Sequence, residues 1–211
     1  NGVYRLTDEG WQSVTGLPKP QAEGVATLGP TGLIHYVTGQ SPRGEANSER
    51  SDHTEVHEHR CFDPDDGQWR KLAPIPTARN SATGGWVSGL LVVTGGRTAA
   101  GNLSVTEIYE PETDSWRSAA PLPLPQAGTA GTVAEGHLHV FGGEVFTPEA
   151  GVFEEVWRYS LAEDRWLALP AMPTPRHGVG AVTLGDGIHV LGGATEPGGR
   201  GTSDSHEVLS L

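Results

Sequence analysis

The segment YEPETDSW, residues Tyr109 to Trp116, decides the fold because its aromatic residue and its tryptophan recur at the same spacing along the chain. Glycine doublets lie at 95–96 and 142–143, before the copies that begin at Tyr109 and Tyr159, and again at 192–193, and Gly39-Gln40 is interpreted as a degenerate doublet. Successive doublets lie 56, 47 and 50 residues apart. This period is typical of a four-stranded propeller blade of about 50 residues. The pairs seven residues apart are Tyr4 and Trp11, Phe62 and Trp69, Tyr109 and Trp116, and Tyr159 and Trp166.

An apolar strand ending in Gly-Gly, followed by an aromatic residue, a turn and a tryptophan, resembles the kelch repeat, and the resemblance covers essentially the whole chain. It implies an all-β, kelch-type β-propeller, with about four blades in this chain as part of a six-bladed ring. The repeat style is similar to that of exported bacterial kelch and galactose-oxidase-like propellers, which implies a periplasmic or secreted protein. Such folds serve both as binding modules and as enzymes, so the fold alone does not choose a function.

We expect one propeller domain over residues 1–211, divided by the repeat pattern. The end of a blade occupies 1–15, full blades occupy 16–72, 73–119 and 120–169, and a blade without its outer strand occupies 170–211. The first unit has a third as well as a fourth strand, which would duplicate the last strand of the chain, expected at 206–211. We therefore expect one or more blades to precede residue 1, because a ring with an open strand edge invites aggregation.

Composition narrows the classes of partner. The formal net charge of −12 argues against a nucleic-acid backbone as the main partner. No stretch approaches the run of about 18 apolar residues that a membrane span needs, and the chain does not start with a signal peptide. The single cysteine, Cys61, rules out an internal disulfide and lies inside a repeat strand. A copper site with a tyrosine–cysteine cross-link is therefore not indicated, and we expect no cofactor.

One repeated position carries the main functional signal. Sixteen residues before the first glycine of each doublet stand polar side chains, each preceded at three residues by a proline, and these side chains are Glu23, Arg79, Gln126 and Arg176. In a propeller this position lies where the chain enters the innermost strand, so we predict a polar ring at one mouth of the central channel. Arginine suits bidentate recognition of carboxylate or phosphate, and Asn80 and His177 could add hydrogen bonds. Equally, these residues could bond only to neighbouring loop carbonyls.

The ring leads to two hypotheses of different classes. In the first, the protein is a binding module that holds a protein or glycan through its loop face and channel mouth, with Arg79, Arg176, Gln126 and Asn80 as ligand-binding residues. In the second, it is a carbohydrate or sugar-acid epimerase or mutarotase, in which Glu23 is the general base and His177 a second proton-transfer group. The second follows a resemblance to bacterial kelch sialic-acid mutarotases, whose sites use a carboxylate and an arginine. The sequence leaves the oligomeric state open.

Two loops and one histidine run complete the candidates. His53, His57 and His59 alternate with Glu55 and Glu58, and alternation on one strand would place them on one face in a divalent-metal geometry. A solvated strand is the more common reading of such a run, so metal binding is the weaker hypothesis. The long polar insertion at 41–55 has a length that is typical of functional or mobile loops. The loop with Glu144 and Phe146 is expected to open on one face of the disc, where loops carry function.

Overall fold

The computed structural model describes residues 2–146 and 149–211, which form an all-β structure with one turn of 3-10 helix, η1 (Arg50–Asp52). Sheet one contains β3 (Val25–Leu28), β4 (Ile34–Val37), β7 (His59–Asp63) and β8 (Gln68–Lys71). Sheet two contains β9 (Thr83–Val87), β10 (Leu90–Thr94), β13 (Thr106–Glu110) and β14 (Ser115–Ala119). Sheet three contains β15 (Ala130–Ala134), β16 (His137–Phe141), β19 (Val156–Ser160) and β20 (Arg165–Leu169). Sheet four contains β21 (Gly180–Leu184), β22 (Gly187–Leu191) and β23 (His206–Ser210).

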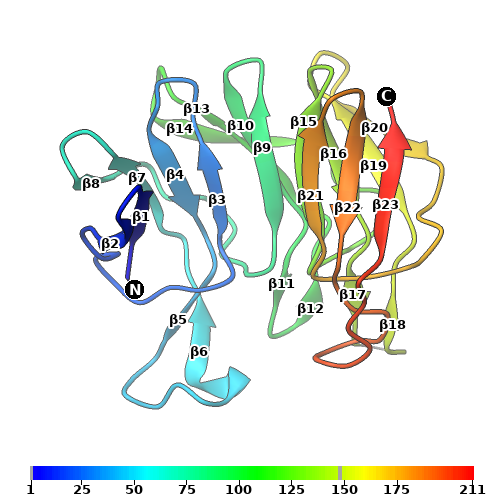
Figure 1. Ribbon diagram of the computed structural model, residues 1–211, viewed down its shortest axis with the longest axis horizontal. Helices are drawn as coiled ribbons and strands as arrows, with labels where there is room; N and C mark the ends of the chain where they lie inside the picture. The colour runs from blue at the N-terminus through cyan, green and yellow to red at the C-terminus, as the bar shows by residue number, and fades with distance from the viewer. Residues whose placement is uncertain (1, 147–148) are drawn as a thin grey trace.

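Each sheet is an antiparallel meander, and the sheets stand side by side in chain order (Figure 1). The innermost strands contact one another in the order β3, β9, β15 and β21. Three apolar clusters fill the spaces between successive sheets and include Val93 and Tyr109, Val92 and Leu138, and Phe141 and Val190. The core therefore lies between sheets, which is the packing of propeller blades, and this confirms the predicted fold class. The six-bladed ring stays a prediction.

Short two-stranded ribbons project from one side of the arc, between the second and third strands of the first three sheets. They are β5 (Gln40–Pro42) with β6 (His53–Glu55), β11 (Arg97–Thr98) with β12 (Gly101–Asn102), and β17 (Glu144–Val145) with β18 (Gly151–Val152). Figure 1 shows all three ribbons below the sheets. We call this side the loop face. The loop of Glu144 and Phe146 opens on it, as predicted, and the insertion at 41–55 opens on it as well.

The glycine doublets are required by close approach of the backbone. The first residue of the doublet is left-handed, with φ of 65° at Gly95 and 59° at Gly142. A Cβ on Gly96 would lie 2.8 Å from the Asn80 carbonyl oxygen, and one on Gly143 would lie 2.7 Å from that of Ala127. The second glycine also donates its N–H to the next sheet, as Gly96 does to Gln126 O at 2.8 Å. The doublet thus joins neighbouring sheets where a side chain does not fit.

The structure of the first repeat corrects our assignment of its glycine doublet. Thr38 has the left-handed φ of 56°, and the N–H of Gly39 donates to Arg79 O at 2.8 Å, as the second doublet glycine does in later repeats. The degenerate doublet is therefore Thr38-Gly39, and the interpretation of Gly39-Gln40 was wrong. The cause is that a threonine replaces the first glycine of the doublet. The turn between β3 and β4, at residues 29–33, is also longer than the turn at 88–89 that joins β9 and β10.

A tyrosine, an aspartate and a tryptophan fix the linker that enters sheets two and three. In sheet two, Tyr109 donates to Asp114 Oδ1 at 2.8 Å, and the same oxygen accepts the Ala73 N–H at 2.9 Å. The indole of Trp116 donates to the Ala73 carbonyl at 2.9 Å. Donation from the Ala73 N–H, followed by that from Tyr109, lowers the pKa of Asp114 against the opposing effect of burial. Sheet three repeats the arrangement with Tyr159, Asp164, Trp166 and Ala120.

Large apolar side chains are exposed at both ends of the arc that the described residues form. The hairpin of β1 (Tyr4–Thr7) and β2 (Gly10–Ser13) forms a separate two-stranded sheet beside sheet one, and its Trp11 is 72% exposed. At the other end, Leu184 and Val208 lie exposed on sheet four. Figure 1 places the hairpin and β23 at opposite ends of the long axis.

Candidate functional site

The two arginines predicted to ring the channel mouth lie inside the sheets. Arg79 is fully buried, ion-pairs with Glu107, and donates to Thr77 O at 2.8 Å and to Val93 O at 3.2 Å. Burial lowers its pKa, which the charge of Glu107 opposes. Arg176 is equally buried and bonds to Glu207 Oε2 at 2.8 Å. Both guanidinium groups tie the entry of the inner strand to the third strand of their own sheet.

Gln126 and Asn80 are also buried and internally bonded. Gln126 donates to Gly142 O at 2.8 Å, and its amide oxygen accepts the Trp157 indole N–H at 2.7 Å. Asn80 Oδ1 accepts a hydrogen bond from Ser81 at 2.9 Å. The structure therefore gives these residues and both arginines the bracing role that we weighed as the alternative. Ligand binding by them stays a prediction.

Glu23 is not equivalent to Arg79, which corrects the predicted ring. Its carbonyl accepts the Ser81 N–H at 2.9 Å, and Ser81 O in turn accepts the Gly128 N–H at 3.0 Å. Gly178 continues the series by donating to Gly128 O at 2.8 Å, and all four residues have a left-handed φ between 55° and 67°. We call this series the axial ladder. The residue equivalent to Arg79 is Gln21, which donates to Thr38 O.

The histidine run does not form the predicted single strand. His53 lies on β6 and contacts Asn47, whereas His59 lies on β7 in another sheet, fully buried against His35, with the two imidazole nitrogens 2.9 Å apart. His57 lies between the strands and bonds to Ile75 O at 2.8 Å. Within residues 2–146 and 149–211, no group of three or more histidine, cysteine, aspartate or glutamate residues is placed to hold a metal ion. The expectation of one common face was therefore wrong.

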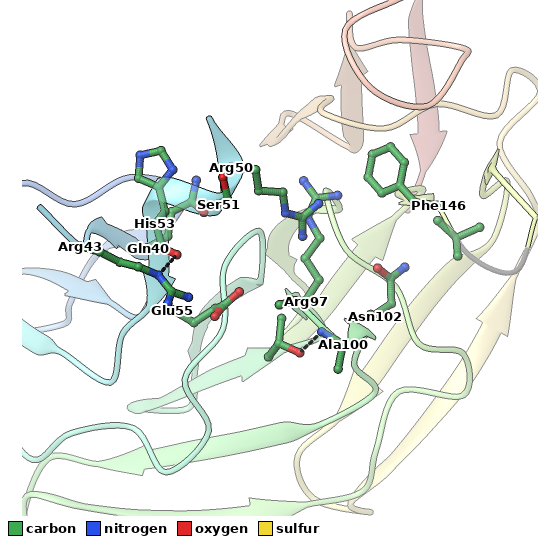
Figure 2. A pocket seen from close by; sticks show the side chains of 14 residues that line it. Gln40, Arg43, Arg50, Ser51, His53, Glu55, Arg97, Ala100, Asn102 and Phe146 are labelled. Atoms are coloured by element: carbon green, nitrogen blue, oxygen red, sulfur yellow. Dashed lines mark hydrogen bonds between the residues drawn. The ribbon is translucent and has the colours of Figure 1, made fainter. Parts of the chain in front are cut away.

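A polar pocket of about 500 Å³ lies on the loop face. It lies between the β5–β6 ribbon with η1 and the β11–β12 ribbon, with Phe146 on its far wall (Figure 2). Its guanidinium groups belong to Arg43, Arg50 and Arg97, and Glu55 is the one carboxylate among the described residues of its lining. We call it the arginine pocket. It concentrates positive charge on a chain of formal net charge −12.

The three arginines differ in how they are held. Arg97 donates to Glu144 Oε1 at 2.6 Å and is nearly buried. Its guanidinium carbon also lies 5.3 Å from the centre of the Phe146 ring, and that of Arg50 lies 6.0 Å from the same ring. Arg43 donates through Nε to His53 O at 2.7 Å. In the described part of the chain, no carboxylate ion-pairs with Arg43 or Arg50, so both keep donors for an incoming anion.

A smaller hollow of about 240 Å³ adjoins the arginine pocket and shares Gln40, Arg50, His53 and Arg97 with it. The hollow reaches the axial ladder, because Glu23 and Asn80 also line it. The Glu23 carboxylate contacts Ser81 Oγ and lies 3.8 Å from Arg97 Nη2. His177 lies beyond, with Nδ1 3.5 Å from Glu144 Oε2. Of the two catalytic candidates, Glu23 therefore faces the hollow and His177 does not line it.

Sequence reasoning located the loops of this site but missed its main side chains. Arg43 and Arg50 lie in the insertion that was marked as functional, but no repeated position singles them out. Arg97 directly follows a glycine doublet, where later repeats have Glu144 and Ala194. A comparison of residues after the doublets would therefore have found the Arg97–Glu144 pair.

The stacked four-stranded sheets define a β-propeller arrangement. The Kelch motif family matches residues 78–123, which include all four strands of sheet two. Together with the repetition of that sheet along the chain, this match over the second repeat supports a kelch-repeat propeller. A search of curated proteins finds no match. No helix among the described residues is long and apolar enough to cross a membrane.

Proposed function

We propose that this protein is a binding propeller that holds an acidic segment of a partner protein in the arginine pocket. Kelch propellers are commonly protein-binding modules, which gives the class of function. The observation that carries the proposal is the set of guanidinium groups around the pocket, two of which have no carboxylate partner in the described structure.

The chemistry of the pocket favours an anion that also has an apolar portion. Arg43 and Arg50 are exposed and can each form bidentate bonds to a carboxylate. Phe146 is 40% exposed and offers a ring face beside them. Arg97 is held by Glu144 and therefore fixes the pocket floor, while the exposed arginines are free to move onto the partner. An acidic peptide with an aromatic or aliphatic residue satisfies both features.

Fluorescence anisotropy with three labelled peptides tests this proposal. The peptides alternate glycine with glutamate, glutamine or lysine around one central phenylalanine. We expect only the glutamate peptide to bind, with an affinity that falls as salt rises. The double variant Arg43→Glu/Arg50→Glu should weaken binding by about tenfold or more. Equal binding of the glutamine peptide would contradict the proposal.

The matched control reverses two charges away from the pocket, at Lys71 and Arg165 on the outer strands. The variant Lys71→Glu/Arg165→Glu has the same net charge as the pocket variant, and we expect it to bind the peptide normally. An equal loss in both variants would mean that the whole charge of the chain, not the pocket, governs binding. Displacement of the peptide by an acidic oligosaccharide, with tighter binding of the sugar, would favour a glycan partner.

A sugar-acid epimerase or mutarotase is the second candidate, favoured by the Glu23 carboxylate and the Arg97 guanidinium on the wall of the smaller hollow. In this candidate, Arg97 binds the acid group of the sugar, which is the role that the sequence analysis predicted for Arg79 and Arg176. Exchange between the anomers of an acidic sugar, followed by NMR, tests this candidate. If the wild-type protein accelerates exchange, Glu23→Gln should abolish the acceleration and leave sugar binding intact. No acceleration by the wild type would exclude the mutarotase, and the absence of any new epimer in the same spectra would exclude the epimerase.

A further inference from the structure

The carboxylate of the arginine pocket, Glu55, has no cation beside it. Glu55 lies on β6, where it is the strand partner of Gln40 on β5, and its side chain is directed into the pocket (Figure 2). The residue is partly buried. Asn80 Nδ2 donates to Glu55 Oε1 at 3.4 Å, which is a long hydrogen bond. In the described part of the chain, no lysine, arginine or histidine forms an ion pair with Glu55.

Arg97 cannot serve Glu55, because its donors are engaged by other groups. Its Nη1 donates to Glu144 Oε1 at 2.6 Å, and its Nη2 lies 3.8 Å from Glu23 Oε2. Its Nε donates to Asn80 Oδ1 at 3.4 Å. Two of the three carboxylates in this region, Glu144 and Glu23, are therefore within ion-pair distance of Arg97. Glu55 is the third, and it has only the amide of Asn80.

The two exposed arginines are held away from Glu55. Arg43 donates through Nε to His53 O at 2.7 Å. The guanidinium carbon of Arg50 lies 6.0 Å from the centre of the Phe146 ring, on the far wall of the pocket. Both arginines line the same pocket as Glu55, yet neither pairs with it among the described residues. The pocket therefore keeps one negative and two positive sites apart.

A partner that covers the pocket would remove water from all three sites. An ionised carboxylate that loses water without gaining a cation or hydrogen-bond donors is strongly unfavourable. A segment with acidic residues alone would satisfy Arg43 and Arg50, but it would bury Glu55 beside further negative charge. A segment that also brings a cation satisfies the carboxylate as well as the arginines.

Gln40 narrows the kind of cation. Gln40 and Glu55 are directly opposite each other in the antiparallel ribbon, so their side chains lie on the same face. Gln40 Nε2 donates to Glu23 Oε1 at 3.1 Å, which leaves the amide oxygen of Gln40 as an acceptor. A carboxylate and an amide oxygen from adjacent positions suit a lysine ammonium, which carries three donors on a compact group.

We propose that the partner segment carries a lysine among its acidic residues. The lysine ammonium binds to Glu55 and to the amide oxygen of Gln40, while the acidic residues bind to Arg43 and Arg50. This inference rests on the proposed function and names the charge pattern that the pocket selects. Glu55 is then a specificity-determining residue, because it favours a segment with both charges over one that is acidic throughout.

Fluorescence anisotropy with derivatives of the glutamate peptide tests this inference. In the derivatives, lysine or acetyl-lysine replaces each glycine in turn, so that the aliphatic chain is kept and the charge differs. We expect lysine in at least one position to bind the wild type about tenfold more tightly than acetyl-lysine there. If lysine is no better at any position while the glutamate peptide binds, this inference is overturned and the proposed function stands. If no peptide binds, both are overturned.

Glu55→Gln separates pairing with this carboxylate from a general attraction of lysine to an acidic chain. The variant keeps an acceptor for Asn80, and its preference for lysine should fall to about twofold or less. It should also bind the glutamate peptide without lysine about threefold more tightly than the wild type does, because a like charge is removed.

Glu112→Gln is the matched control, because it removes one negative charge from an exposed residue in the turn between β13 and β14. We expect this control to keep the wild-type preference for lysine, and thermal melting compares the folding of both variants. An equal loss of preference in Glu112→Gln, or a full preference that persists in Glu55→Gln, would overturn the assignment of the lysine to Glu55.

Discussion

All four sheets are built from the same repeat, but equivalent side chains are buried to different degrees in the two central and the two terminal sheets. Leu91 and Val93 of sheet two are fully buried between neighbours, whereas their equivalents in sheet one, Ile34 and Tyr36, face outward and are exposed to different degrees. The sheets therefore have the same strand register and differ in what lies against them. In such an array a residue's contribution to stability depends on its nearest-neighbour interface as well as on its own sheet.

A pair of histidines shows the same contrast. His35 and His59 of sheet one bond through ring nitrogens 2.9 Å apart, and their equivalents in sheet four, His189 and His206, do so at 2.8 Å. The first pair is buried against Trp86, Tyr109 and Trp116 of sheet two. The second pair lies on the open face of sheet four. Similar side-chain geometry thus occurs in a buried and in an exposed pair, which makes the two pairs matched probes of burial.

The largest expected effect is a difference between the two buried arginines in the free energy of unfolding that is lost on substitution. Arg79→Met leaves Glu107 buried without its ion-pair partner, so we expect a loss of about 3–5 kcal/mol in the free energy of unfolding. Arg176→Met should cost about 1–2 kcal/mol, because Glu207 is 19% exposed and can be solvated. Urea denaturation measures both. The double variant Arg79→Met/Glu107→Leu should regain part of the loss, and equal losses for the two single variants would contradict the comparison.

The histidine pairs predict a difference in pH dependence. Burial lowers the pKa of His35 to about 4 and that of His59 to about 3, from 6.5. The folded protein therefore favours the neutral pair, and stability is lost as the pH falls from about 6.5 towards these values. We expect a loss of about 1–3 kcal/mol between pH 7 and pH 5.

Urea denaturation at several pH values tests this difference. His35→Leu/His59→Leu should flatten the decline between pH 7 and pH 5, where the carboxylates with lowered pKa, such as Asp114 and Asp164, remain ionised. The control His189→Leu/His206→Leu should leave the decline unchanged. If the stability of His35→Leu/His59→Leu still declines between pH 7 and pH 5, titratable groups other than this histidine pair cause the decline.

The smallest expected effect concerns one hydrogen bond. Trp116→Phe removes an indole N–H that donates to Ala73 O, whereas Trp69→Phe removes one that has no partner in the described structure. Both variants lose similar ring area, so the difference isolates the hydrogen bond. We expect Trp116→Phe to be more destabilising by about 1 kcal/mol, measured by thermal and urea unfolding. A greater loss for Trp69→Phe would show that its N–H is bonded in solution.

The fold could be predicted from the sequence because each repeat signal has a steric or hydrogen-bonding cause. The doublet glycines meet backbone oxygens, and Tyr109 and Trp116 brace the linker. The prediction failed where another residue takes a glycine's role: Thr38 accepts a left-handed φ and donates its hydroxyl to Arg79 O at 2.6 Å. The residue types around Thr38 do not show that this threonine stands in place of the first doublet glycine.

The candidate site was less predictable, for a physical reason. A polar residue at a repeated position can face the channel or brace its own sheet, and spacing is the same in both cases. Arg79 and Arg176 have internal partners, Glu107 and Glu207, that lie about 30 residues further along the chain. The arginine pocket instead combines loops of different repeats, and their proximity depends on how the sheets are stacked.

The axial ladder joins the sheets through backbone atoms alone, from Glu23 to Gly178. Ribbons of different length are therefore compatible with the same stacking of the sheets. The β5–β6 ribbon carries η1 and a long turn, while β11 and β12 are joined by two residues. Recognition sequences can therefore be exchanged in a ribbon without altering the backbone ladder that joins the sheets. For protein engineering, the chain is a scaffold whose ribbons can carry grafted sequences, and an insertion at the Ala99-Ala100 turn would enter the wall of the arginine pocket.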